Sequence, residues 1–117
     1  MDMASKKDVL QLIQQNISFI LVGTTHPGNI GAAARAMKNM GIHQMGLVSP
    51  KEFPHEKAFF RAKAATDVLE KAVIYKSLKE AISETKLVIG TSARNRKVPW
   101  PIVSPSEAAE EIVSFSK

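Results

Sequence analysis

The chain has 117 residues and no cysteine, which fits one domain with a modest core and excludes disulfides and thiolate chemistry. Its 16 Lys and Arg outnumber 11 Asp and Glu, and the net charge of +5 either favours a polyanion such as nucleic acid or only keeps a small domain soluble. No stretch approaches the roughly 18 apolar residues that cross a bilayer, and residues 1–8 hold no apolar signal core, so we expect a cytoplasmic protein without a membrane partner.

The first half of the chain alternates between helical and strand patterns. Residues 1–16 are polar with a few apolar residues at helical spacing, and we interpret them as a leader or a short surface helix. Residues 18–23 predict a buried strand. Residues 29–40 predict a helix with Asn29 as its N-cap and Gly41 as its stop. Five apolar residues are expected on the face that lies on the sheet: Ile30, Ala33, Ala34, Met37 and Met40.

The second half continues the alternation. Further strands are predicted at 45–48, 72–75 and 87–90. Further helices are predicted at 56–65, 66–71, 78–85 and 107–115. Ser77 and Glu80 form a capping box, and Ser104 or Ser106 caps the last helix. Because short apolar strands alternate with helices, we predict an α/β domain over residues 17–117 with a mostly parallel sheet.

Two turns stand where an α/β sheet usually binds its ligand, outside the carboxyl ends of the strands. Residues 24–29 follow the first predicted strand, and residues 90–94 follow the fourth. If these strands are neighbours, the two turns meet at one edge and offer small residues, hydroxyls and free backbone groups. Alternatively, Gly28 only serves a tight strand-to-helix turn. Residues 28–31 match neither a dinucleotide fingerprint nor a Walker loop.

The basic residues each have a functional and a plain interpretation. Arg35 either grips a phosphate or polarises a reacting hydroxyl, or it is a solvated surface residue. The segment that follows residue 90 carries a basic-aromatic cluster, which either holds RNA phosphate and a stacked base or is a solvated loop: Arg94, Arg96, Lys97 and Trp100. Three further cations are interpreted as a solvated helix face: Lys57, Arg61 and Lys63. The spacing of the three histidines predicts no metal site and no Ser-His-Asp triad.

Several separate segments resemble the SPOUT class of RNA ribose methyltransferases in type, order and spacing. The most specific is residues 25–38, which read THPGNIGAAARAMK. Further matching segments are 40–41, 47–50, 65–69, 88–94 and 99–101. The resemblance covers roughly residues 18–112. Within this class, the chain is similar in particular to enzymes that methylate cytidine and uridine in the tRNA anticodon loop. The resemblance implies the α/β knot fold of that class.

The resemblance also implies an activity, which is transfer of a methyl group from S-adenosylmethionine to a ribose 2′-hydroxyl of tRNA by a homodimer without a metal. It places Asn29 and Arg35 in the catalytic site and cofactor contacts at Thr91, Ser92 and Ala93. The expected RNA-binding residues are His26, Arg94, Arg96 and Lys97. Because a guanidinium stays protonated, we expect Arg35 to orient the ribose and lower the pKa of its hydroxyl rather than act as a base.

In the resembling family the chain continues through a further strand, a Gly-x-Glu-rich loop and a threaded helix that form a trefoil knot. Residues 17–117 therefore resemble the N-terminal part of the SPOUT domain, before the knot. We expect this part to bind the cofactor weakly or not at all, to be inactive alone and to self-associate through exposed sheet edge. The alternative function is a non-catalytic, basic α/β module that binds RNA.

Overall fold

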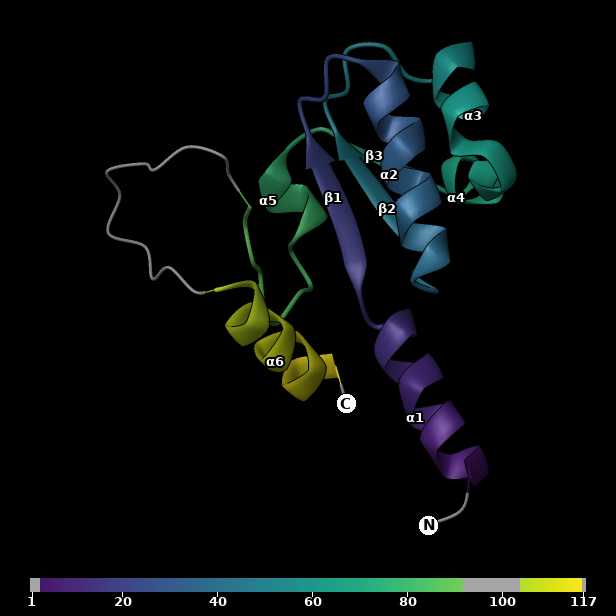
Figure 1. Ribbon diagram of the computed structural model, residues 1–117. Helices are drawn as coiled ribbons and strands as arrows, with labels where there is room; N and C mark the ends of the chain where they lie inside the picture. Colours follow the sequence, from purple (N-terminus) through teal and green to yellow (C-terminus); the bar gives the residue numbers. More distant parts are fainter. Residues whose placement is uncertain (1–2, 92–103, 117) are drawn as a thin grey trace.

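The computed structural model describes residues 3–91 and 104–116, and its centre is a parallel sheet of three strands. The strands are β1 (Ser18–Val22), β2 (Gln44–Val48) and β3 (Val73–Tyr75), in the order β1-β2-β3. Ser18 pairs with Gln44 at one end of β1, and Val22 pairs with Val48 at the other. The α/β class and the parallel sheet predicted from the sequence are therefore confirmed (Figure 1).

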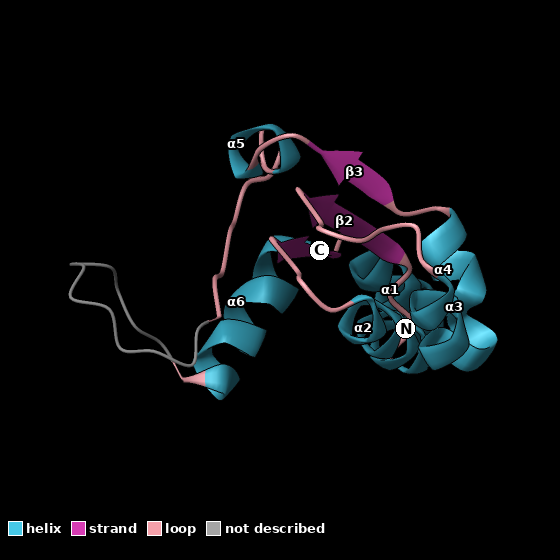
Figure 2. Cartoon of the chain, turned by 90° about the horizontal axis from the view of Figure 1, so that it is seen from above, coloured by secondary structure: helices cyan, strands magenta, loops and turns pink. Residues whose placement is uncertain are grey.

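Helices cover both faces of this sheet (Figure 2). One face carries α2 (Pro27–Asn39), α3 (Glu56–Ala62), the 3-10 turn η1 (Lys63–Ala65) and α4 (Thr66–Glu70). The other face carries α5 (Leu78–Ala81), whereas α6 (Pro105–Ser116) lies below the sheet, toward the amino end of β1 (Figure 1). The N-terminal helix α1 (Met3–Gln15) lies at the amino end of β1, where the Asn16 side-chain amide donates a hydrogen bond to the Ser116 carbonyl.

The core lies between the sheet and the helices α2 to α4. Its largest fully buried side chains are Ile30, Met37, Leu47 and Val68. Small residues complete the core where the helices meet: Gly31, Ala34, Ala58, Ala62 and Ala65. Because these residues carry at most a methyl group, the backbones of α2 and α3 pack against each other directly.

The start of α2 corrects one prediction, and its end confirms another. The N-cap is His26 rather than Asn29, and Pro27 occupies the first helical position, which suits its fixed φ and its missing N–H. Gly41 ends the helix with a φ of 74°, as predicted. Its N–H bonds to the Lys38 carbonyl while the next N–H bonds to the Met37 carbonyl, which is a Schellman motif. Met40 is 48% exposed and not in the core, because it is the C-cap.

The fourth predicted strand is wrong. Residues 87–90 form no strand in the structure, because they share no ladder hydrogen bonds with β1 or β3. The helix predicted before it is also shorter than expected, since α5 ends at Ala81. The chain then turns, and the Thr85 hydroxyl donates to the Ile82 carbonyl at 2.8 Å. The four apolar or small residues at 87–90 thus form an extended segment without a partner strand.

The predicted serine caps hold at both later helices, but at α5 no bond from the Ser77 N–H to the Glu80 carboxylate completes the predicted capping box. Ser77 Oγ accepts the Glu80 N–H at 3.2 Å at the start of α5. At α6, Ser104 Oγ accepts the Glu107 N–H and Glu107 Oε1 accepts the Ser104 N–H, both at 3.2 Å. Ser104 is therefore the cap, not Ser106, and this reciprocal pair is a complete capping box. The hydrogen bond from the Ser104 N–H to the carboxylate, together with the Ser104 hydroxyl, holds the pKa of Glu107 below its ordinary value.

Candidate functional site

The turn from β1 into α2 is held against the sheet by backbone hydrogen bonds. Gly23, with a φ of 61°, donates its N–H to the Val48 carbonyl at 2.8 Å. Lys51 donates its N–H to the Thr24 carbonyl at 3.1 Å, which ties the loop after β2 to the loop after β1. The segment from Thr24 to Asn29 is therefore fixed at the carboxyl edge of the sheet, where α/β proteins bind ligands.

Three of the predicted site residues lie on this turn or on α2, the helix that follows it. His26, Asn29 and Arg35 are all exposed. Asn29 stands in the first turn of α2, and its N–H bonds to the His26 carbonyl at 3.0 Å. Arg35 follows six residues later on the same helix, about 9 Å along its axis. His26 and Asn29 therefore lie together at the start of α2, and Arg35 lies further along it.

Arg35 also belongs to a row of residues that faces α3. Gly28, Gly31, Arg35 and Lys38 are spaced by three, four and three residues, so they lie along one side of α2. The Arg61 side chain lies against Gly28, and Lys38 Nζ donates to the Ala64 carbonyl at 2.9 Å, so this side faces α3 and η1. Arg35 stands between these contacts, at the exposed rim of the helix pair.

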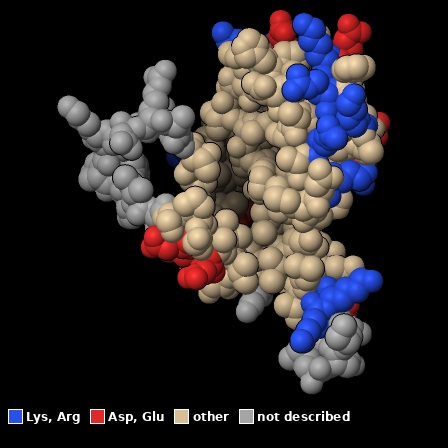
Figure 3. All heavy atoms as spheres, viewed as in Figure 1, with Lys and Arg blue, Asp and Glu red and all other residues tan. Residues whose placement is uncertain are grey.

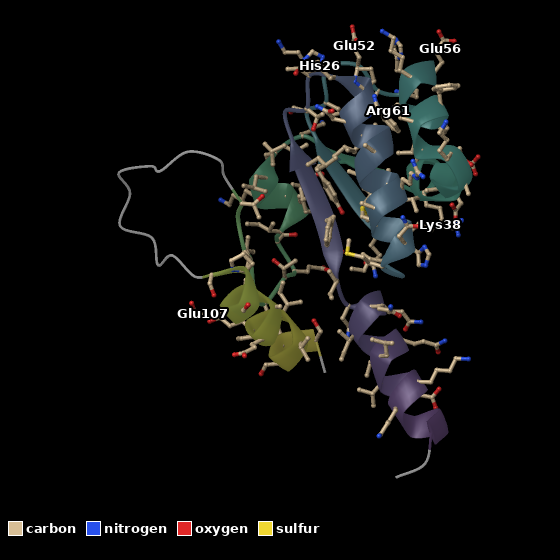
Figure 4. The ribbon with its side chains drawn as sticks, in the orientation of Figure 1. His26, Lys38, Glu52, Glu56, Arg61 and Glu107 are labelled. Atoms are coloured by element: carbon tan, nitrogen blue, oxygen red, sulfur yellow. The ribbon has the colours of Figure 1, made fainter. Side chains whose placement is uncertain are left out.

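Arg61 of α3 is a residue that the sequence interpretation set aside. A β-carbon at Gly28 would lie 3.6 Å from Arg61 Nη1 and 3.7 Å from its Cγ, so the guanidinium reaches the first turn of α2. Figure 4 shows Arg61 between the upper parts of α2 and α3. The signal that points to it is the pair Ala58 and Ala62, whose small side chains allow α3 to approach Gly31.

The lower part of the same helix row is pinned by an ion pair. Lys38 Nζ lies 2.9 Å from Asp67 Oδ1 and joins α2 to α4. The hydrogen bond from this ammonium holds the pKa of the Asp67 carboxyl below its ordinary value. Among the residues that the structure describes, this is the only ion pair. The ion pair lies one turn beyond Arg35, toward the C-terminal end of α2.

The predicted cofactor side is represented by Thr91, which is exposed. Ser92 and Ala93 lie outside the described residues, as do Arg94, Arg96 and Lys97. Two open hollows among the described residues lie elsewhere, one along α6 at Ala109 and Val113 and one between Gln14 of α1 and His43. Neither of them includes Thr91 or the turn before α2.

The described residues include neither a membrane-spanning helix nor a metal-binding group of side chains. No helix in the described ranges has the length and hydropathy to cross a membrane. No group of three or more His, Asp or Glu side chains within those ranges is arranged to hold a metal ion.

Comparison with protein families decides the family of this chain. The model described as the SpoU rRNA methylase family matches residues 16–111, which is most of the chain. The chain belongs to the SpoU methylase family. The family resemblance stated from the motifs is thereby confirmed.

Two curated relatives of this SpoU-family chain carry the name TrmJ. It is 55% identical over 93 residues to the tRNA (cytidine/uridine/adenosine-2′-O-)-methyltransferase TrmJ of Pseudomonas aeruginosa, covering 80% of this chain and 36% of that protein. It is 46% identical over 100 residues to the tRNA (cytidine/uridine-2′-O-)-methyltransferase TrmJ of Cronobacter sakazakii, covering 86% and 41%. The chain thus spans about two fifths of the length of these relatives.

Solved structures agree with the SPOUT fold. TrmJ from Z. mobilis superposes with a TM-score of 0.80 at 36% identity over 83% of this chain and 44% of that chain. A probable methylase family protein from Haemophilus influenzae superposes with a TM-score of 0.80 at 42% identity, over 87% and 42%. The SpoU-family chain therefore has the fold of the corresponding part of these methylases.

Proposed function

We propose that this chain belongs to an enzyme that transfers a methyl group from S-adenosylmethionine to a ribose 2′-hydroxyl of tRNA. One observation carries the proposal. The motif that the resemblance makes catalytic, residues 25–38, begins at the carboxyl edge of the sheet and continues along α2, with Asn29 and Arg35 exposed on this helix. The 55% identity to a tRNA 2′-O-methyltransferase over 80% of the chain supports the choice of substrate and reaction.

Arg35 holds the RNA substrate in this proposal. Its guanidinium is planar, always charged and able to bind two phosphate oxygens at once, so it positions the phosphate that flanks the target ribose. A fixed positive charge beside the 2′-hydroxyl also favours the developing alkoxide and so lowers the pKa of that hydroxyl. Asn29 offers an amide that can donate to or accept from the ribose hydroxyl. His26 contacts the RNA at the start of α2.

S-adenosylmethionine supplies the methyl group in the proposed reaction. Its expected contacts are Thr91, Ser92 and Ala93, of which Thr91 is exposed. The described residues form no pocket for this cofactor around Thr91. We assign to residues 17–117 the RNA-facing part of a catalytic domain and to residues 1–16 an accessory segment, the helix α1.

The remaining parts of the proposal follow from the family. The enzyme acts as a homodimer in the cytoplasm, without a metal, and Arg94, Arg96 and Lys97 contact tRNA together with His26. A basic balance of +5 supports a polyanionic substrate. The homodimer is expected to place the exposed sheet edges of two chains within one assembly.

The test uses the 117-residue chain and, in parallel, the longest open reading frame that contains it. Each protein is incubated with unfractionated tRNA and S-adenosylmethionine carrying a tritiated methyl group, and the digested nucleosides are separated by mass. Labelled 2′-O-methylcytidine or 2′-O-methyluridine from either protein supports the proposal. Absence of label from both, together with salt-dependent tRNA binding, would overturn it in favour of the non-catalytic RNA-binding module.

A further inference from the structure

Positive charge gathers on one surface of the molecule, over α2 and α3. Figure 3 shows Lys and Arg side chains in a band along these two helices. We define the α2–α3 basic strip as Arg35, Lys57 and Arg61, which are all exposed. Lys38 and Lys63 are left out of this definition because Lys38 pairs with Asp67 and Lys63 Nζ sits 4.7 Å above the Phe60 ring.

The three cations line both sides of one seam. Lys57 and Arg61 are four residues apart, so they stand one above the other on the same side of α3. That side faces α2, because Arg61 reaches Gly28. Arg35 stands on the side of α2 that faces α3, one turn beyond Gly31. Arg61 reaches the first turn of α2, which begins at the carboxyl edge of the sheet, and Arg35 lies further along the same seam.

The strip has no partner of opposite charge within the described part of the chain. The ion pair there is Lys38–Asp67, which includes none of the three cations. Glu56 precedes Lys57 by one residue and is therefore turned by about 100° around the axis of α3. Like charges at a spacing of four residues repel and destabilise a helix slightly. Such a cluster beside an open edge attracts anions from solution.

We propose that the α2–α3 basic strip binds the phosphate backbone of the RNA substrate, with Arg61 on a phosphate adjacent to the ribose held by Arg35. This inference rests on the proposed function, which it extends from the target nucleotide to the strand that flanks it. RNA is favoured over other anions because the strip is continuous with the ribose site. Two of its three cations are arginines, whose forked donors match phosphate oxygens.

The test measures binding of unfractionated tRNA by fluorescence anisotropy over a series of salt concentrations. The variants are Lys57→Glu and Arg61→Met, the second of which keeps the stem that packs on Gly31. The matched control is Lys79→Glu, an exposed lysine of α5 on the opposite face of the sheet. Arg61→Lys tests for rescue by a conserved charge, and circular dichroism establishes that each variant is folded.

We expect Lys57→Glu and Arg61→Met each to weaken tRNA binding several-fold and to lower the slope of log K against log salt by about one. Lys79→Glu should change the affinity less than about twofold, and Arg61→Lys should restore most of the salt slope. A merely structural role of Arg61 would not move the salt slope. Equal effects of Lys57→Glu and Lys79→Glu would overturn the inference, as would unchanged slopes. Competition by polyglutamate at the same charge concentration as tRNA would overturn it in favour of an acidic protein partner.

Failure of this inference and failure of the proposed function give different results. If the parent protein methylates tRNA while the strip variants keep the wild-type KM, the strip is not an RNA surface and the function stands. If the strip variants lose tRNA affinity while no protein transfers a methyl group, the strip stands and the enzyme assignment falls. If the strip binds RNA and the enzyme assignment is also correct, Lys57→Glu raises KM for tRNA and leaves kcat close to the wild-type value.

Discussion

Gly31 of α2 lies against the carbonyl oxygen of Ala58 in α3, with no room for a side chain between them. A β-carbon at Gly31 would fall far inside the van der Waals contact of that oxygen and 2.9 Å from Arg61 Cβ. The two helices therefore touch through their backbones. This contact carries Arg61 to the first turn of α2 and thereby joins two helices in one surface.

Replacing Gly31 by Ala should destabilise the fold. Overpacking of a tight core costs about 1–3 kcal/mol, and the better helix propensity of alanine returns up to about 1 kcal/mol. We expect the free energy of unfolding to fall by about 1–2 kcal/mol in urea titrations. The control is Gly28→Ala, whose β-carbon would meet Arg61 at an ordinary 3.6 Å, and whose effect should stay within about 0.5 kcal/mol. Equal stability of the two variants would contradict the close helix contact.

Replacing Arg35 by Ala in the methyl-transferring protein should abolish most of the activity without unfolding it. Loss of a positioning group costs about 100-fold or more in kcat/KM, and the exposed position limits the change in stability to about 0.5 kcal/mol. Arg35→Lys keeps the charge but loses the forked donors, so we expect it to recover only part of the rate. Wild-type turnover by Arg35→Ala on tRNA would remove this residue from the mechanism.

The pKa of Asp67 should depend on Lys38. The ammonium holds this pKa below its ordinary value of 3.8 in the folded protein, so the pair stabilises the fold above pH 3.8. This stabilisation is lost as the pH falls through the lowered pKa. Lys38→Met should raise the pKa of Asp67 in a carboxyl-detected NMR titration. The control is Lys71→Met, which removes an equal charge four residues along the chain, where the backbone N–H of Lys71 bonds to the Asp67 carbonyl. The side-chain bond to the Asp67 carboxylate comes from Lys38. An identical shift of the Asp67 pKa in both variants would exclude the specific pair.

The start of α6 should depend on Ser104 and not on Ser106. Loss of a serine N-cap costs about 1 kcal/mol, because the Glu107 N–H then loses its acceptor. We expect Ser104→Ala to lower the opening free energy of the α6 amides by about this amount in hydrogen-exchange measurements. Ser106→Ala should change it by less than about 0.5 kcal/mol. A larger effect of Ser106→Ala would show that Ser106, and not Ser104, caps α6.

Local signals in the sequence were enough for most elements. The stop at Gly41 and the caps Ser77 and Ser104 were predictable because each depends on residues no more than a few positions apart. The start of α2 was predicted two residues too late, since Asn29 is a good N-cap in isolation but Pro27 fits the first helical position better. Residues 87–90 were predicted as a strand because an apolar run does not reveal whether a neighbouring strand pairs with it.

The site was predictable only in its local part. The motif around Asn29 and Arg35 is contiguous, so its exposure at the sheet edge followed from a strand, a turn and a helix. Arg61 could not be placed in the same way, because its position depends on how closely α3 approaches Gly31, thirty residues away in the chain. The bond from Lys38 to Asp67 likewise depends on η1, where Lys63 takes a φ of 55°. Distances between distant segments carry no signature in a single sequence.

The loop ties at the end of β1 have an energetic consequence for binding. The hydrogen bonds of Gly23 to Val48 and of Lys51 to Thr24 involve only main-chain groups, so these two ties use no side chain of the turn. A ligand therefore meets a turn whose backbone has already lost its conformational entropy during folding. The ordering cost of association then falls on the incoming strand and not on the protein, which makes this turn a preorganised receptor.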